Sequence, residues 1–189
     1  MPFGTISLVG MPGGGKSTVG KHLARHLAIP FVDSDARIEA RLGESIRTFF
    51  DREGEDAFRQ IEADVIGELL ATDGEQVLAT GGGAVLREVN RQQLHDRSTV
   101  LYLRSTPEDI YRRLRNDTTR PLLQVADPLA KLRELYQQRD PLYRKTAHYV
   151  LESARPSVHG LVNMALMQLE LAGLIDPGRV AATVGAEPL

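Results

Sequence analysis

The stretch from Gly10 to Ser17 constrains this chain more than any other part of its 189 residues. It reads Gly-Met-Pro-Gly-Gly-Gly-Lys-Ser and fits the phosphate-loop pattern G-x-x-x-x-G-K-[ST]. An apolar run at residues 5–9 precedes it, and a segment with apolar residues at every fourth position follows it. A strand, a glycine-rich loop and a helix in this order favour an α/β fold that binds a nucleotide through its phosphates.

The residue types of this loop have a chemical reason. Glycine allows backbone angles that are closed to other residues, so consecutive N–H groups can converge on phosphate oxygens, and the following helix adds the positive end of its dipole. The lysine can reach the β- and γ-phosphates, and the serine hydroxyl can ligate Mg²⁺. The loop alone leaves open whether the chain is an enzyme or a nucleotide-dependent switch. The residues that we expect to bind ATP here are Gly13, Gly14, Gly15, Lys16, Ser17 and Thr18.

Short apolar runs alternate with helical segments along the chain, which predicts a parallel sheet with right-handed crossovers. Between the second and third runs, three predicted helices replace the single crossover helix and indicate an inserted binding subdomain. Residues 116–128 contain two prolines that discourage a helix, and they predict either a mobile lid or a surface loop. The apolar runs are residues 5–9, 30–33, 76–80, 99–103 and 147–151, and the inserted helices are residues 36–42, 45–52 and 57–70.

Composition excludes several classes of function. The chain has no cysteine, so it has neither disulfides nor a thiolate nucleophile. Its formal net charge of −2 gives no electrostatic footprint for nucleic acid or an anionic membrane. The N-terminus lacks a secretory pattern, and no run approaches the roughly 18 apolar residues of a spanning helix. We therefore expect a cytoplasmic protein with one domain over residues 1–175, an insertion at about 34–62, and a flexible tail over 176–189.

Asp33 and Asp35 close the second predicted strand, and in extended chain their side chains would share a face. This is the edge of the sheet at which ligands bind and at which the phosphate loop emerges. One acid could serve Mg²⁺ through water, and the other could accept a proton from a substrate hydroxyl. The competing interpretation is capping of the next helix, because aspartate is a favoured N-cap. Beside a phosphate loop we favour the functional interpretation.

Other candidate features are less specific by themselves. Arg59 and Glu62 lie one helical turn apart, a spacing that by itself favours a surface ion pair worth about 0.3 kcal/mol. Residues 81–83 are three glycines directly after the third strand, which favours close approach of a ligand to the backbone over a flexible turn. Arg120 lies in the predicted lid, from which it could stabilise the charge of a transition state.

Two more segments carry little weight alone. Arg139 lies in an amphipathic segment that we expect to end near Pro141. His22 and His26 are four residues apart on a predicted helix, but no third ligand accompanies them in the sequence. We expect both histidines to be surface residues rather than part of a metal site.

Together these motifs resemble shikimate kinase. Residues 31–62, FVDSDARIEARLGESIRTFFDREGEDAFRQIE, resemble the second strand and substrate-binding subdomain of that family, and LATGGGAV at 78–85 resembles its glycine-rich substrate loop. TRPLL at 119–123 resembles its lid, and RDPLY at 139–143 resembles the segment that carries its second substrate arginine. The resemblance implies a P-loop fold of the nucleoside-monophosphate-kinase type. That fold is an α/β three-layer sandwich whose five-stranded parallel sheet has the order 2-3-1-4-5.

The resemblance also implies a reaction, the phosphorylation by ATP of the 3-hydroxyl of shikimate in chorismate and aromatic amino-acid biosynthesis. It makes Asp35 the candidate base and implies that Glu62 orients one of two arginines that pair with the substrate carboxylate. Ser17 directly, and Asp33 through water, would hold Mg²⁺. The implied partners are ATP/ADP and shikimate, with no nucleic acid, no membrane and a monomeric state. The implied catalytic residues are Asp35, Lys16 and Arg120; the substrate-binding residues are Asp35, Arg59, Gly81, Gly82, Gly83 and Arg139; further nucleotide contacts are Arg113, Arg120 and Arg155.

One departure from the general P-loop pattern is informative. No apolar strand ends in a Walker B aspartate, because residues 76–80 lead into glycines. This counts against a generic ATPase, whereas it is expected in the resembled family. Two alternatives stay open: a related small-metabolite kinase of the gluconate type, which would lack the Arg59 and Arg139 pair, and a non-catalytic nucleotide-binding regulator, which should have lost part of the chemical set.

Overall fold

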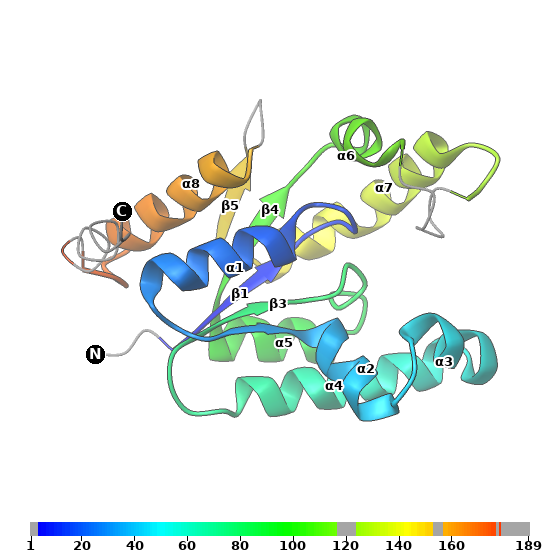
Figure 1. The fold of residues 1–189 in the computed structure, drawn as a ribbon, viewed down its shortest axis with the longest axis horizontal. Coiled ribbons are helices and arrows are strands. Elements are labelled where there is room, and N and C mark those ends of the chain that lie inside the picture. The colour runs from blue at the N-terminus through cyan, green and yellow to red at the C-terminus, as the bar shows by residue number, and fades with distance from the viewer. Residues whose placement is uncertain (1–3, 117–123, 153–156, 177, 179–189) are drawn as a thin grey trace, which may run out of the picture.

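The structure is a computed structural model that describes residues 4–116, 124–152, 157–176 and 178. Most of the predicted lid and of the predicted tail lies outside the described residues, and so do Arg120 and Arg155. The described part has one parallel sheet covered by helices on both faces (Figure 1).

The sheet has the predicted order, β2-β3-β1-β4-β5, and every pairing is parallel. Its central strand β1 pairs with β3 on one side and with β4 on the other. The side chains of β1 and β3 are buried throughout, which explains why these strands read as continuous apolar runs. The strands are β1 Thr5–Val9, β2 Phe31–Asp33, β3 Gln76–Ala79, β4 Ser98–Arg104 and β5 Tyr149–Glu152.

Helices form a layer on each face of the sheet (Figure 1). On one face, α1 and α8 pack together over an apolar cluster that includes Leu8, Leu23 and Leu166. On the other face, α4, α5 and α7 cover a second cluster that includes Ile66 and Leu94. This confirms the three-layer α/β sandwich. These helices are α1 Lys16–Leu27, α4 Glu55–Leu70, α5 Glu88–Arg97, α7 Pro128–Thr146 and α8 Val158–Leu171.

The inserted segment after β2 folds as the three predicted helices, α2 Ser34–Leu42, α3 Ile46–Glu53 and α4. Gly43 and Gly54 end the first two of them, at φ angles of +69° and +86°, which are left-handed values that glycine adopts without strain. In Figure 1, α2 and α3 lie beyond the carboxyl ends of the strands, at the same end of the sheet as α6 Pro107–Leu114. The insertion and α6 therefore flank the edge at which the phosphate loop emerges.

The expected end of a helix near Pro141 is wrong, because α7 continues through this proline to Thr146. A proline in a helix removes one N–H bond, and tertiary packing can outweigh that cost. Here Tyr143 and Thr146, both after the proline, are fully buried, so the turn that they form is held by the core. Pro128 is the first residue of α7, where its missing N–H would have no partner in the helix, and the side chain of Asp127 caps this helix end.

No helix in the described part of the chain combines the length and the apolarity needed to cross a bilayer.

We predict that Gly20→Ala in α1 lowers the free energy of unfolding by about 1–3 kcal/mol, although alanine favours helices. A Cβ at Gly20 would lie 2.6 Å from the ring of Phe31 and 3.1 Å from Leu8, so the packing of α1 on the sheet would have to shift. Urea unfolding measures the change. Gly67→Ala in α4 is the matched control, because its Cβ would meet only the movable end of Gln93. That variant should be neutral or up to about 1 kcal/mol more stable. Equal destabilisation of both variants would contradict the argument.

Candidate active site

The phosphate loop connects β1 to α1, as predicted. Gly13 and Gly15 adopt φ angles of +75° and +84°, which are left-handed values that favour glycine. The ammonium group of Lys16 donates hydrogen bonds of 2.9 Å to the carbonyl oxygens of Gly10 and Met11, which holds the lysine over its own loop. The loop thus has a concave backbone with a cation at its rim, as a polyphosphate requires.

The hydroxyl of Ser17 donates a hydrogen bond of 2.5 Å to Oδ2 of Asp33. The other oxygen of Asp33 accepts bonds from the backbone N–H groups of Asp35 and Ala36, so Asp33 is also the N-cap of α2. The capping and functional interpretations of Asp33 are therefore compatible, because each uses a different oxygen. A hydroxyl and a carboxylate side by side are hard oxygen ligands of the kind that Mg²⁺ prefers.

Asp35 lies in the first turn of α2 and not in extended chain, so the expected reason for its orientation is wrong. The cap at Asp33 starts the helix at Ser34 and turns the backbone before Asp35 is reached. Both carboxylates still line one cavity. Burial raises the pKa of Asp35 to about 6, with further increases from Asp33 and Glu62 and an opposing effect of Lys16.

The three glycines after β3 each lie against a different element of the site. A Cβ at Gly81 would lie 2.6 Å from Oδ1 of Asp35, and a Cβ at Gly82 would lie 2.6 Å from the ring of Pro12 in the phosphate loop. A Cβ at Gly83 would overlap the guanidinium of Arg59. The glycines were expected to admit a ligand. The structure shows that they also make room for three side chains of the site itself.

Arg59 and Glu62 form an inward-facing pair rather than a surface ion pair. Nη1 of Arg59 donates a hydrogen bond of 2.7 Å to Oε1 of Glu62, which is only 1% exposed. Burial raises the pKa of Glu62, although the charges of Arg59, Arg139 and Arg87 oppose the shift. The arginine is thus held beside the glycine loop by a buried carboxylate.

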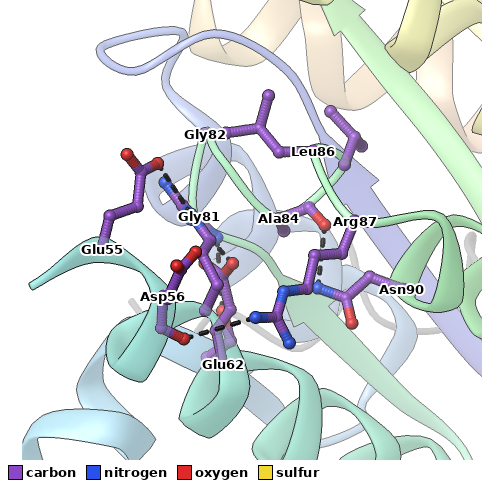
Figure 2. Close-up of polar contacts among 12 residues, drawn as sticks. Glu55, Asp56, Glu62, Gly81, Gly82, Ala84, Leu86, Arg87 and Asn90 are labelled. Carbon is purple, nitrogen blue, oxygen red and sulfur yellow. Dashed lines mark hydrogen bonds and ion pairs between the residues drawn. The ribbon is translucent and has the colours of Figure 1, made fainter.

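Arg87 links this arginine-bearing helix to the start of α5. Its guanidinium donates to the backbone oxygen of Asp56 and to the side chain of Gln60, both in α4. Figure 2 shows Arg87 reaching toward Asp56, with Asn90 bonded to the backbone oxygen of Ala84. The segment after the glycine loop is therefore bonded to α5 through Asn90, and Arg87 bonds the start of α5 to α4, the helix that carries Arg59.

Arg139 projects from α7 toward the same region, because its charge acts on both Glu62 and Tyr143. Its Nε atom is buried, and no described residue accepts a hydrogen bond from it. A buried donor without a partner has a cost of about 1–3 kcal/mol, which an anionic ligand could remove. This supports the predicted role in binding a carboxylate.

Arg113 lies in α6 beside the phosphate loop. It donates to the hydroxyl of Ser105 at 3.2 Å and to the backbone oxygen of Asp109, and a Cβ at Gly15 would lie 3.7 Å from its Nη1. Burial lowers its pKa. Its place next to the loop suits a contact with a bound nucleotide.

A cavity of about 250 Å³ lies between the phosphate loop, the start of α2 and the glycine loop. Thr18 and Thr80 also line it. The threonine hydroxyl at position 80 donates to the backbone oxygen of Leu8, which ties the start of the glycine loop to β1. Its other lining residues come from the phosphate loop, from the start of α2 and from the glycine loop: Pro12, Gly13, Gly15, Lys16, Ser17, Asp33, Asp35, Gly81 and Gly82.

The two histidines of α1 have a third beside them, which the sequence spacing did not reveal. His159 of α8 lines a second cavity, of about 230 Å³, together with His22 and His26. Across the described ranges, however, no group of three His, Cys, Asp or Glu side chains is arranged to hold a metal ion.

Comparison with known proteins identifies the family. The profile of the shikimate kinase family matches residues 12–170. A shikimate kinase of Paracidovorax citrulli is 58% identical over 92% of this chain and 96% of its own length, and one of Burkholderia thailandensis is 55% identical over 92% and 94%. The chain belongs to the shikimate kinase family. It is thus a kinase, and the resemblance drawn from its motifs is confirmed.

Solved structures agree with this assignment. A shikimate kinase from Acinetobacter baumannii in complex with shikimate has a TM-score of 0.83 and 43% identity, and the match covers 93% of this chain and 96% of that one. A gluconokinase from Sinorhizobium meliloti has a TM-score of 0.60 at 20% identity, over 91% and 95% of the two chains. The second likeness shows a shared fold and no more.

Sequence reasoning missed three residues that organise the site. Pro12 touches Gly82, Arg87 binds α4, and Tyr143 donates a hydrogen bond of 2.5 Å to the carbonyl oxygen of Gly82. Pro12 lies at a variable position of the phosphate-loop motif, and Tyr143 is the last residue of the RDPLY segment, so both lie within recognised motifs. Arg87 had no local signal, because its partners lie 27 and 31 residues away.

We predict that Asp35→Asn stabilises the ligand-free protein at pH 8, by about 1–3 kcal/mol. The folded-state pKa of about 6 exceeds the ordinary value of 3.8, so ionised Asp35 destabilises the fold. That destabilisation is complete above pH 6, declines as the pH falls from about 6 to 4, and is absent below that. The gain in Tm should therefore be larger at pH 8 than at pH 5. Thermal unfolding with EDTA present measures it, and a gain that does not grow with pH would contradict the prediction.

Proposed function

We propose that this member of the shikimate kinase family transfers the γ-phosphoryl group of ATP to the 3-hydroxyl of shikimate, giving shikimate 3-phosphate and ADP. The observation that carries the proposal is the position of Asp35. A carboxyl group with a pKa of about 6 lines the same cavity as the phosphate-loop lysine. The charge of Glu62 acts on it, and the charges of Arg59 and Arg139 act on Glu62 in turn. A carboxylate that ionises near neutrality is suited to accept the proton of an attacking hydroxyl.

On the acceptor side, we assign the substrate carboxylate to Arg59 and Arg139. Glu62 accepts a hydrogen bond from Arg59, and the charge of Arg139 acts on the same carboxylate, which supports a shared role for the two arginines. A planar guanidinium matches a carboxylate in bidentate geometry, which fixes the orientation of the substrate ring. The ring hydroxyls would then meet Asp35 and the backbone of residues 81–83.

On the donor side, residues 13–18 would hold the phosphates of ATP, with Lys16 moving from its carbonyl partners to the β- and γ-oxygens. Arg113 would flank the adenine. Arg120 and Arg155 keep the roles that the resemblance implies, closure on the phosphates and a second adenine contact. Because phosphoryl transfer needs mainly positioning and charge stabilisation, these cations supply most of the chemistry.

We further propose Mg²⁺ as the metal of the reaction, held by the Ser17 hydroxyl directly and by Asp33 through water. The observed hydrogen bond between these two groups supports the assignment, because it places both oxygens at the phosphate loop. Mg²⁺ held by these residues would neutralise negative charge on the phosphoryl group being transferred. A monomeric state, a cytoplasmic location and a lid over residues 116–128 stay predictions from the sequence.

A gluconate-type kinase and a non-catalytic regulator are less well supported. The structural likeness to a gluconokinase extends to the fold alone. A regulator would have no need of a buried, unpaired arginine donor or of a carboxylate whose burial costs stability. A panel assay with ATP and shikimate, gluconate or nucleoside monophosphates tests the proposal directly. Turnover with an acceptor other than shikimate, or ATP binding without any turnover, would refute it.

We predict that Arg59→Lys raises the KM for shikimate about tenfold or more and leaves the KM for ATP within about twofold. Lysine keeps a positive charge beside buried Glu62, so the fold should survive, but it loses bidentate binding. Arg47→Lys in α3 is the matched control, since the side chain of Arg47 is 64% exposed and should leave both constants unchanged. Unaltered shikimate kinetics in Arg59→Lys would exclude the assigned role.

We predict that Asp35→Asn lowers kcat by about 10²–10⁴, the range typical of acid–base groups. The amide cannot accept the proton of the hydroxyl at neutral pH, although it has nearly the same shape. Steady-state assays at saturating ATP and shikimate measure kcat, and the Tm of the variant shows that the protein is folded. A rate close to that of the unaltered protein would exclude the base role.

A further inference from the structure

Tyr143 carries a buried hydroxyl group that has no role in the reaction proposed above. It lies in α7, one turn after Arg139, and its side chain is fully buried. Its hydroxyl donates a hydrogen bond of 2.5 Å to the backbone oxygen of Gly82, 61 residues away in the sequence. A side chain of a helix that covers the sheet thus bonds to the middle residue of the glycine loop, which lies against the phosphate loop.

The same hydroxyl also faces the acceptor-binding arginines. Arg139 lies one helical turn before Tyr143 on α7, and the charges of Arg139 and Arg59 both act on the tyrosine hydroxyl. Because a hydroxyl can donate one hydrogen bond and accept others, it can serve the loop and Arg139 at once. Burial raises its pKa to about 12, so it remains a donor over the physiological range.

Gly82 in turn touches the donor half of the site. A Cβ at this position would lie 2.6 Å from the ring of Pro12, so the loop backbone rests on the phosphate loop. A chain of contacts therefore runs from Arg139 through Tyr143 and Gly82 to Pro12. It connects the residue that would hold the substrate carboxylate with the loop that would hold ATP.

A second hydrogen bond anchors α7 to the sheet. Asp140 accepts a hydrogen bond of 2.7 Å from the hydroxyl of Tyr102 in β4 and one of 2.9 Å from Arg144. The rings of Tyr102 and Tyr143 pack at a centroid distance of 5.0 Å. Two buried tyrosines in contact thus hold one helix, but only the hydroxyl of Tyr143 reaches the glycine loop.

We propose that Tyr143 is a positioning residue. It fixes the glycine loop relative to Arg139, so that a bound acceptor is aligned with the phosphate loop. The inference rests on the proposed function, since it assigns Arg139 and the loop to the acceptor. Without the hydroxyl, the carbonyl of Gly82 loses its hydrogen-bond partner and Arg139 loses a polar neighbour. The helix itself remains anchored through Asp140.

The test compares Tyr143→Phe with Tyr102→Phe. Each variant keeps the aromatic ring and removes one hydroxyl group. The hydroxyl of Tyr143 belongs to α7 and the hydroxyl of Tyr102 bonds to α7, so the two variants should change Tm by similar amounts. We expect Tyr143→Phe to raise the KM for shikimate about tenfold, with the KM for ATP within about twofold. Tyr102→Phe should leave both constants within about twofold of the unaltered protein.

Hydrogen exchange of the ligand-free protein supplies a readout that needs no substrate. Within the loop, the amide of Ala84 bonds to Gly81 and that of Leu86 bonds to Gly83. These amides should exchange faster in Tyr143→Phe and not in Tyr102→Phe. Unchanged exchange and KM in Tyr143→Phe, or an equal effect of Tyr102→Phe, would overturn the inference while shikimate turnover by the unaltered protein still stood. If the unaltered protein did not turn over shikimate, the proposed function would fail, and exchange alone would decide whether Tyr143 holds the loop.

Discussion

The close approach of three elements to residues 81–83 is the constraint on which the rest of the site depends. Asp35 from α2, Pro12 from the phosphate loop and Arg59 from α4 each occupy space that a Cβ in this loop would fill. The sheet order makes this possible, because β3 lies between β2 and β1 and its carboxyl end faces both neighbours. A loop without side chains at this point brings Asp35, the phosphate loop and Arg59 close together, as the roles that we propose for them require.

This convergence has an electrostatic cost. Asp33, Asp35 and Glu62 concentrate negative charge in a region that also holds Lys16 and two arginines. Burial outweighs the attraction of the cations at both Asp35 and Glu62, because the pKa of each is raised. The site therefore destabilises the fold, as expected where function needs ionisable groups out of water. The apolar clusters on the two faces of the sheet offset this cost.

Sequence reasoning could predict the elements that have local signals. The sequence predicted the phosphate loop, the five strands and the three inserted helices to within a few residues. Their signals are local, since they consist of apolar periodicity and of glycines that end helices. The sheet order came from the resemblance and not from the pattern. Two errors arose from features that residue spacing does not reveal. The helix continues past Pro141 because its last turn is buried in the core, and Asp35 is helical because the side chain of Asp33 caps α2. His159 joins His22 and His26 only because α8 packs on α1.

The absent Walker B aspartate has a physical counterpart in Asp33. Since the Ser17 hydroxyl gives its only hydrogen to Asp33, both of its lone pairs remain free for a cation. The second oxygen of Asp33 caps α2, and that cap turns the chain so that Asp35 enters the cavity two residues later. One carboxylate thus orients the proposed metal ligand, Ser17, and starts the helix that carries the proposed base, Asp35. The two proposed roles are coupled, because a single side chain fixes the positions of both residues.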